Sequence, residues 1–325
     1  MLTRLLLATA LFSSLPLCSG ANTDWPNAEK PIQITVPAPG GSGTGDTIAR
    51  MLGEQLALRL KTSVVIENKP GANGNIGATA AAKYAPDGYR LLFSWAGTLA
   101  VNPSMYVSIN YDPQKDFDPI ALICDVPNIL VVNNEQPVKD LQQFIAYAKN
   151  NPGKLNFGST GIGSSMHLAG ELFMRETTTK MVHVPYNAPG TATTNLIANE
   201  IQTMFQLVPG IAGQVKANKV RAIAIMSPMR SPALPDVPTT AELGFPQLMS
   251  STWFALLAPK NTPQPIVERV NKEVNQILND VVFKQKLAEI GATPMGGTPK
   301  DLAMHLKQEL DKWSVVIQAA GIKNQ

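Results

Sequence analysis

Residues 32–60 read IQITVPAPGGSGTGDTIARMLGEQLALRL. The β-branched run Ile32–Val36 predicts a buried strand, and helical periodicity follows over Thr47–Leu60. The glycine-rich segment Pro37–Asp46 joins the two, so the chain passes from strand to helix through a tight loop. Such strand–loop–helix units build α/β folds.

The same unit recurs along the chain. Further β-branched or apolar runs predict strands at Val64–Ile66, Leu91–Trp95, Ile129–Val132, Leu155–Phe157, Val182–Val184, Ile201–Phe205 and Val220–Met226. Helical periodicity lies between them, for example at Leu141–Asn150 and Ser165–Arg175. In the C-terminal third, Thr262-Pro263 and Thr298-Pro299 each predict an N-cap and first residue of an amphipathic helix. We therefore expect an α/β protein with mainly parallel sheets.

The length suits two domains, and two apolar runs are candidate crossings between them. These runs are Ile120–Cys124 and Phe254–Ala258. We expect residues 24–122 and 248–325 to form a discontinuous first domain, and residues 123–247 to form the second.

The N-terminus has the pattern of a secretory signal peptide. Arg4 precedes an apolar run that ends at Leu17 and is too short to span a bilayer, and small residues follow. We expect residues 1–21 to be removed after Ala21, or one residue earlier after Gly20, which leaves a periplasmic protein. Cys18 does not indicate a lipoprotein, because Leu17 stands where a small residue is required.

Composition excludes several classes of function. Loss of Arg4 would lower the net charge from +3 to +2, and the basic residues are scattered, so no nucleic-acid partner is expected. The chain has three histidines, and its mature part would keep one cysteine, Cys124. No metal site is expected from so few ligands, and Cys124 is expected to be a buried apolar residue.

The loop Pro37–Asp46 has the chemistry of an anion site, because N–H groups at a helix N-terminus attract negative charge. Glu67 stands about where a ribose-binding acid would, but the glycine spacing does not match G-x-G-x-x-G. No P-loop lysine is present either, so no cofactor is expected. The alternative is a structural turn in which Asp46 serves only as the helix N-cap.

A second loop rich in glycine and serine, residues 157–167, also leads from a predicted strand into a predicted helix. Its hydroxyl and N–H groups suit a carboxylate. The spacing G-x-S-x-G of serine hydrolases is absent, and no Asp/His pair lies at an interpretable distance. His167 either contacts ligand or packs beside Glu171, and His183 is expected to be a strand residue. Trp95 and Tyr186 either border the site or belong to the core.

Two such loops, one in each predicted domain, indicate a single anion site between the domains. A nucleophile, a base and an oxyanion hole do not assemble from these residues, so we expect binding without catalysis.

Short motifs occur in order over nearly the whole mature chain. They include Trp25-Pro26, Val65–Ala72, Pro86–Tyr89, Tyr111–Pro113, Asn151–Leu155, His167–Phe173, His183–Tyr186 and Leu234–Thr239. Any one of them is weak, but the ordered set is specific. In this set the sequence resembles the Bug/TctC family, the extracytoplasmic solute receptors of tripartite tricarboxylate transporters.

The resemblance implies a two-domain Venus-flytrap fold of the type II periplasmic-binding-protein architecture. It also implies capture of a small carboxylate and delivery to integral-membrane permease subunits. The ligand is expected to be a plain mono- or dicarboxylate, and aromatic acids are admitted if Trp95 or Tyr186 faces the cleft. The protein is expected to act as a monomer. The expected ligand-binding residues are Gly40, Gly41, Ser42, Gly43, Asp46, Ser159, Thr160, Gly161, Ser164, Ser165, His167 and Gln206.

Two departures from the family pattern bear on the ligand. The first loop is two residues longer than the usual Pro-Gly-Gly-x-x-Asp, which leaves open the choice of amides that face the ligand. Asn195 and Gln206 stand where many relatives carry aspartate, which would weaken recognition of an amino group. Two alternatives to transport are the presentation of ligand to a membrane sensor kinase and, with less support, a periplasmic hydrolase.

Overall fold

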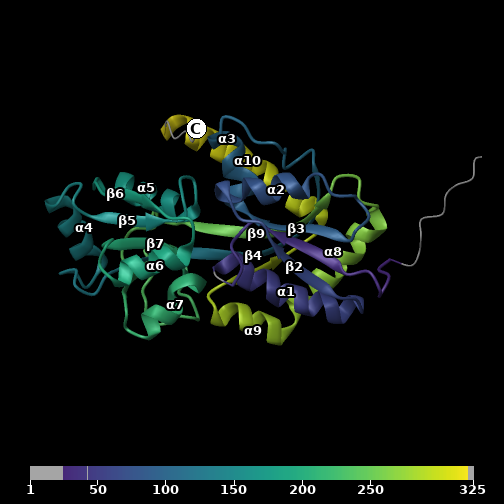
Figure 1. The fold of residues 1–325 in the computed structure, drawn as a ribbon. Coiled ribbons are helices and arrows are strands. Elements are labelled where there is room, and N and C mark those ends of the chain that lie inside the picture. Colours follow the sequence, from purple (N-terminus) through teal and green to yellow (C-terminus); the bar gives the residue numbers. More distant parts are fainter. Residues whose placement is uncertain (1–24, 42, 321–325) are drawn as a thin grey trace, which may run out of the picture.

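The computed structural model describes residues 25–41 and 43–320. These residues form two lobes that share one ten-stranded sheet. In Figure 1 the first lobe (β1–β3, β10, α1–α3 and α8–α10) lies on the right, and the second lobe (β5–β8 and α4–α7) lies on the left. The long strands β4 and β9 connect the lobes.

The strands are β1 (Ile32–Val36), β2 (Val64–Asn68), β3 (Arg90–Trp95), β4 (Phe117–Val132), β5 (Asn156–Ser159), β6 (Val182–Pro185), β7 (Thr203–Leu207), β8 (Arg221–Ile225), β9 (Ser251–Pro259) and β10 (Thr293–Gly296). The α-helices are α1 (Thr44–Leu60), α2 (Asn75–Ala81), α3 (Asn102–Met105), α4 (Leu141–Asn150), α5 (Ser165–Thr177), α6 (Pro189–Ile197), α7 (Val208–Lys216), α8 (Gln264–Asn279), α9 (Val281–Glu289) and α10 (Pro299–Ala320). Two short helical turns are η1 (Ala72–Gly74) and η2 (Gly97–Val101).

The sheet is parallel at both ends and antiparallel in the middle. Its order is β2-β1-β3-β9-β4-β7-β5-β6, and β8 and β10 pair with β4 outside this path. Strands β1–β3 pair in parallel in the first lobe, and β5–β7 do so in the second. The chain leaves the first lobe on β4 and returns on β9, so these two strands run in opposite directions. The predicted α/β class is confirmed, with parallel pairing confined to each lobe.

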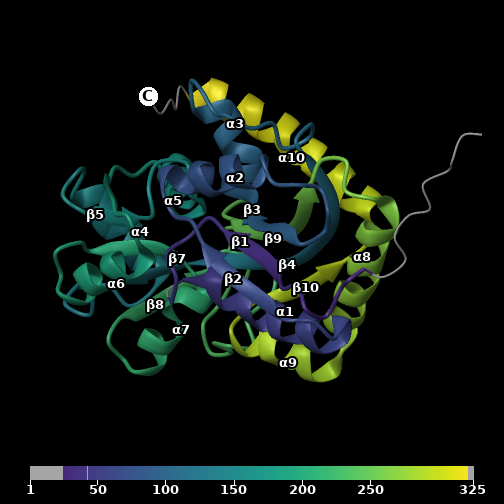
Figure 2. The ribbon, with the colours of Figure 1, turned by 45° about the vertical axis from the view of Figure 1, so that its right-hand side comes forward.

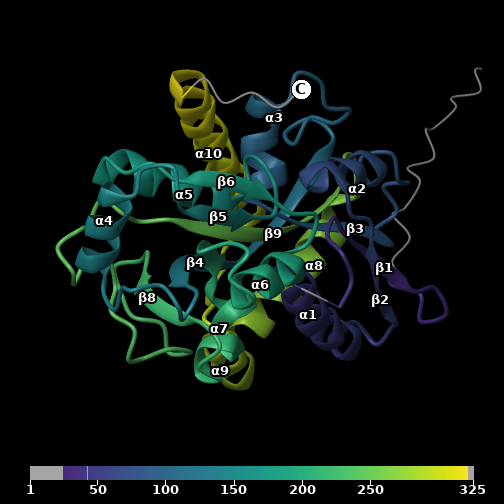
Figure 3. The ribbon, with the colours of Figure 1, turned by 60° about the vertical axis from the view of Figure 1, so that its left-hand side comes forward.

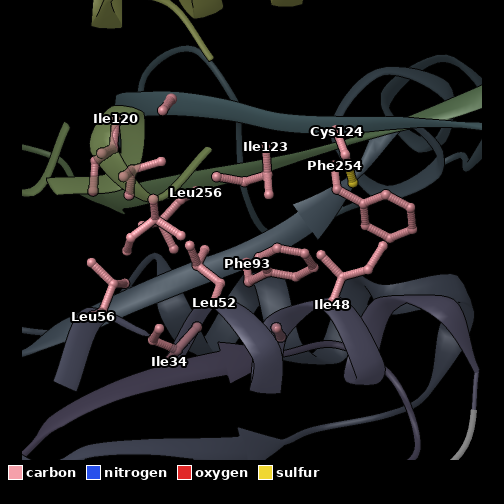
Figure 4. Close-up of a cluster of buried hydrophobic side chains, with 14 of the residues drawn as sticks. Ile34, Ile48, Leu52, Leu56, Phe93, Ile120, Ile123, Cys124, Phe254 and Leu256 are labelled. Atoms are coloured by element: carbon pink, nitrogen blue, oxygen red, sulfur yellow. The ribbon is translucent and has the colours of Figure 1, made fainter. Parts of the chain in front are cut away.

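The core of the first lobe fixes the position of α1. Figure 4 shows Ile48, Leu52 and Leu56 of α1 facing Phe93 of β3, and all four side chains are buried. Burial of an aliphatic side chain of this size contributes roughly 1.5–3 kcal/mol. Cys124, on β4 beside Phe254, is fully buried in the same cluster, as predicted.

The second lobe covers its part of the sheet on both faces. Figure 2 shows α4 and α5 on one side and α6 and α7 on the other. Phe157 of β5 and Phe205 of β7 pack with Phe144 and Phe173 from the helices α4 and α5. This aromatic cluster anchors α5, whose N-terminus carries the second predicted ligand loop.

The predicted strands and helices match observed elements, but the predicted cap of α8 is wrong. Helix α8 has Pro263 as its N-cap and Pro265 in its first turn. Thr262 was the predicted cap, but its hydroxyl donates to the Pro259 carbonyl at 2.7 Å and is used by the preceding turn. Thr298 does cap α10, because its Oγ1 accepts the N–H of Asp301, whose carboxylate accepts the Thr298 N–H in return.

Candidate ligand-binding site

A cavity of about 610 Å³ lies between the lobes. It is bordered in the first lobe by the start of α1, by residues 70–74 and by the aromatic residues Trp95, Tyr106 and Phe254. In the second lobe it is bordered by residues 160–162, 164–166 and 185–189, and by Gln206. Figure 3 shows α6 of the second lobe beside α1 of the first, where a Cβ on Gly43 would lie 3.1 Å from Pro189. The lobes therefore touch at the edge of the cavity.

None of the described residues that line this cavity is an Asp, Glu, Lys or Arg. Arg50 and Arg175 are also absent from the lining. Arg50 is engaged elsewhere, because its guanidinium donates to Asp46 at 2.8 Å and to Asn68 at 3.0 Å. A negatively charged ligand in this cavity would therefore meet neutral donors instead of a paired cation.

The first turn of α1 borders the cavity. Gly43 is the N-cap, has φ 87°, and makes no side-chain capping hydrogen bond among the described residues. Gly43, Thr44 and Gly45 all line the cavity. The first N–H groups of an α-helix have no partner within the helix, and the helix dipole adds a partial positive charge there. This end of α1 can therefore accept an anion.

Asp46 holds the first loop in place from outside the cavity. Its carboxylate accepts the Gly41 N–H at 2.9 Å and the Asn68 side-chain N–H at 2.8 Å, and Arg50 also donates to it. Burial raises the pKa of Asp46, but these hydrogen bonds outweigh it and leave the pKa below its ordinary value. The alternative role of Asp46 as the N-cap is wrong, because Gly43 occupies that position.

The structure separates the predicted residues of the first loop. Gly43 lines the cavity, whereas Gly40, Gly41 and Asp46 are not in its lining. Gly40 packs against Asn68, which a Cβ at Gly40 would approach to 2.7 Å. Ser42 lies outside the described residues.

The second loop is shaped by its own serines. Ser164 is the N-cap of α5, and its Oγ accepts the His167 N–H at 3.3 Å and donates to the Gly161 carbonyl at 2.8 Å. Thr160, Gly161, Ser164 and Ser165 line the cavity. Ser159 and His167 are not in the lining, and they are 0% and 6% exposed. These two residues lie behind the loop.

Ser159 and His183 form a contact that sequence spacing did not reveal. The Ser159 Oγ lies 2.6 Å from His183 Nε2, because the parallel register of β5 and β6 pairs Phe157 with His183. A serine–imidazole pair activates nucleophiles in hydrolases. Here the serine is fully buried and not in the cavity lining, and its Oγ also accepts the Gly161 N–H at 3.0 Å, so it is not presented to a ligand in the cavity. Burial, followed by the charge of His167, lowers the pKa of His183 to about 4.

Gln206 brings an unused donor to the cavity. Its Oε1 accepts the Leu207 N–H at 2.9 Å, which fixes the orientation of the amide. Its Nε2 is buried and has no hydrogen-bond partner among the described residues. The Oγ1 of Thr252, another lining residue, is also buried and has no hydrogen-bond partner among the described residues. Buried polar groups are normally hydrogen-bonded, so both atoms indicate a ligand acceptor or water in this space. Asn195 is not in the lining.

Residues 70–74 line the cavity but were not predicted from the sequence as part of the site. Ala72 and Asn73 have positive φ values, 46° and 51°, between the glycines at 71 and 74. The Asn73 side chain donates to Asn102 at 2.9 Å, which ties this turn to α3. The motif Gly-Ala-Asn-Gly signals a tight turn, but only the fold brings the turn to the cavity.

A second cavity of about 740 Å³ also has lining residues from both lobes. In contrast to the first, its lining includes Asp125, Glu171, Arg175, Glu309 and Lys312. The described residues contain no cluster of three or more His, Cys, Asp or Glu suited to a metal ion. None of their helices has the length and hydropathy required to cross a bilayer.

Comparisons with known proteins agree with this architecture. Residues 48–322 match the family described as the tripartite tricarboxylate transporter family receptor. The chain is 36% identical to protein BugT of Bordetella pertussis (strain Tohama I) over 324 residues, which is 99% of both chains. It superposes on the periplasmic binding protein BugD with a TM-score of 0.85 and 32% identity, over 91% of this chain and 99% of BugD. It superposes on Rpa4515 of R. palustris, solved with adipate, with a TM-score of 0.87 and 34% identity, over 92% of this chain and 99% of the other.

These similarities confirm the predicted two-domain periplasmic-binding-protein architecture, and they show a solute-binding protein and not an enzyme. The family match covers most of the chain, and BugT aligns from end to end. The chain therefore belongs to the receptor family of the tripartite tricarboxylate transporters.

Proposed function

We propose that this protein captures a small carboxylate in the periplasm, between its two lobes, and delivers it to the permease subunits of a tripartite tricarboxylate transporter. The observation that carries the proposal is an interlobe cavity without charged side chains, onto which two helix N-termini open. Residues 1–21 would direct export as a signal peptide and then be removed, and they lie outside the described residues.

The carboxylate would bind to backbone amides and hydroxyls. The first turn of α1 supplies N–H groups at Thr44 and Gly45 from the first lobe. The loop before α5 supplies hydroxyls and amides at Thr160 and Ser165 from the second. Because each lobe contributes part of the site, a bound carboxylate would favour the closed arrangement.

The proposed division into domains follows from the position of the cavity between the lobes. We propose that residues 24–122 with 248–325, and residues 123–247, move as rigid bodies. The hinge would lie in β4 and β9, which pair with each other as far as Pro127 and Ser251. Beyond Pro127, β4 pairs with β7 and β8 of the second lobe.

We propose a preference for plain carboxylates over amino acids. The Gln206 amide offers a neutral donor, and no lining carboxylate among the described residues is present to bind an ammonium group. Trp95 and Tyr186 both line the cavity, which admits aromatic acids. The relative Rpa4515 was solved with adipate, a plain dicarboxylate.

Titration calorimetry with adipate, malate, benzoate and aspartate tests this preference. We expect at least one of the first three to bind at least tenfold more tightly than aspartate, since the aspartate ammonium group would lose water without gaining an anionic partner. Aspartate as the tightest ligand would refute the ligand class. If none of the four acids gives a binding enthalpy, capture of these carboxylates is refuted.

Serine and arginine substitutions test how the anion is held. Ser165→Ala is expected to weaken binding about tenfold to a hundredfold, because a hydrogen bond to a charged group is worth roughly 1.5–3 kcal/mol. Arg50→Ala and Arg175→Ala are expected to change affinity less than about threefold, since neither lines the cavity. Calorimetry measures all three variants. If an arginine variant lost binding while Ser165→Ala bound as wild type does, the anion would lie outside this cavity.

The thermal stability of the empty protein separates the serines. Ser165→Ala should leave it unchanged. Ser164→Ala removes an N-cap and should cost about 1 kcal/mol. Ser159→Ala should also destabilise the empty protein, because it removes the buried hydroxyl that accepts the Gly161 N–H and donates to the Gly161 carbonyl.

A further inference from the structure

The second ligand loop is held from behind by two histidines. His167 Nδ1 accepts the Gly163 N–H at 3.1 Å, so this nitrogen carries no proton. His183 Nε2 lies 2.6 Å from the Ser159 Oγ, which in turn accepts the Gly161 N–H. Each imidazole therefore fixes one glycine of the loop, His167 directly and His183 through Ser159.

Both glycines have backbone conformations that L residues avoid, with φ 114° at Gly161 and φ 78° at Gly163. Such a loop does not keep its shape by backbone preference alone. The Gly161 carbonyl accepts from the Ser159 Oγ at 3.1 Å and the Ser164 Oγ at 2.8 Å. The loop thus faces the cavity on one side and this hydrogen-bonded support on the other.

The two histidine rings pack together beside one carboxylate. Their ring centroids are 4.2 Å apart, and Phe157 packs against both rings. The charged group that faces them is Glu171 on α5, whose Oε1 lies 3.4 Å from His167 Nε2. Hydrogen bonding to His167 lowers the pKa of Glu171, which keeps this carboxylate ionised. The two ring nitrogens of His167 therefore have different partners: Nε2 faces the Glu171 carboxylate, and Nδ1 accepts the Gly163 N–H.

We propose that His167, His183 and Ser159 are positioning residues for carboxylate binding: the hydrogen bonds of His167 Nδ1 and Ser159 Oγ to the loop hold residues 160–166 in the shape that binds ligand. The proposal rests on carboxylate capture as the function of the cavity. None of the three residues lines the cavity, and their effect passes through Gly161 and Gly163.

Two substitutions at His167 test whether the acceptor of the Gly163 N–H is needed for binding. In His167→Asn the side-chain oxygen can take the place of Nδ1 as an acceptor. His167→Leu removes the acceptor. With adipate as the probe at pH 8, we expect His167→Asn to bind within about twofold of wild type, and His167→Leu about three- to tenfold more weakly, the value of one hydrogen bond.

Rescue by a replacement acceptor provides the decisive readout, because a merely structural role would not distinguish Asn from Leu at this position. A His167→Leu variant with wild-type affinity, or a His167→Asn variant that binds as weakly as His167→Leu, would overturn the proposal. At His183, the longer amide of His183→Gln can reach Ser159 in place of Nε2, so it should retain more affinity than His183→Leu.

A measurement without ligand keeps the two proposals distinct. Amide hydrogen exchange of Gly163, followed by ¹⁵N NMR, should be faster than in wild type in His167→Leu but not in His167→Asn. Equal protection in all three proteins would overturn the positioning role. Failure of wild type to bind carboxylates, with the expected exchange pattern, would overturn only the proposed function.

Discussion

Gly163→Ala is expected to weaken carboxylate binding about thirtyfold. A Cβ at Gly163 would overlap the thioether of Met105, which belongs to α3 in the other lobe. Met105 is 1% exposed and packs with Leu168 and Ile317, so it has little room to move. Overpacking of this kind costs typically 1–3 kcal/mol, and about 2 kcal/mol corresponds to thirtyfold. The cost arises only when the lobes are together, so it reduces affinity more than the stability of the open protein.

Gly161→Ala is the matched control for this variant. Gly161 lies two residues earlier and also has a positive φ, but a Cβ there meets no atom within 4 Å. Both variants place an L residue at a positive φ, 114° at Gly161 and 78° at Gly163, whereas only Gly163→Ala meets the opposite lobe. Met105→Ala combined with Gly163→Ala should recover most of the lost affinity. Small-angle scattering should show wild type, but not Gly163→Ala, becoming more compact with adipate. Equal affinities for the two glycine variants would argue against lobe closure at this contact.

Gln206→Glu is expected to lower the affinity for adipate at least a hundredfold at pH 8. The substitution keeps the shape and the acceptor of the Leu207 N–H, but it replaces the unpartnered Nε2 donor with a buried negative charge. Loss of a hydrogen bond to a charged group and repulsion between two poorly solvated anions together exceed about 3 kcal/mol. Burial raises the pKa of a carboxyl, so affinity should partly return at pH 5 as the introduced carboxylate takes up a proton.

Gln142→Glu serves as the control, because it adds the same charge on the exposed face of α4 in the same lobe. Calorimetry with adipate and aspartate on both variants decides the outcome. Gln206→Glu should also shift the ratio of the two affinities toward aspartate, whose ammonium group can pair with the new carboxylate. Unchanged adipate binding by Gln206→Glu would show that the amide does not face the ligand.

Much of the fold could be predicted from local patterns. The run Ile32–Val36 forms β1 over the same residues, and the periodic segment Leu141–Asn150 forms α4. Thr298 caps α10 through a reciprocal bond with Asp301, an arrangement within four residues. Thr262 was misjudged because its hydroxyl had a second local partner, the Pro259 carbonyl. Side-chain capping is predictable only where one partner is available.

The candidate site was predictable as two loops but not as a set of side chains. Ser159 and Ser165 belong to the same loop and have the same chemistry in sequence. In the folded protein Ser159 is fully buried against His183, whereas Ser165 lines the cavity. Likewise Gln206 lines the cavity and Asn195 does not. The distinction depends on strand register and burial, which no local pattern specifies.

Residues close together in the chain were sufficient for the α/β units, the glycine loops at helix N-termini and the family, because periodicity, capping and ordered motifs are short-range properties. The lining of the cavity depends instead on contacts between segments far apart. Gln206 comes from β7 and Thr252 from β9, which lie on opposite sides of β4 in the sheet. Their donors lack partners because the chain folds around this space, and hydrogen-bond satisfaction is a property of the assembled tertiary structure.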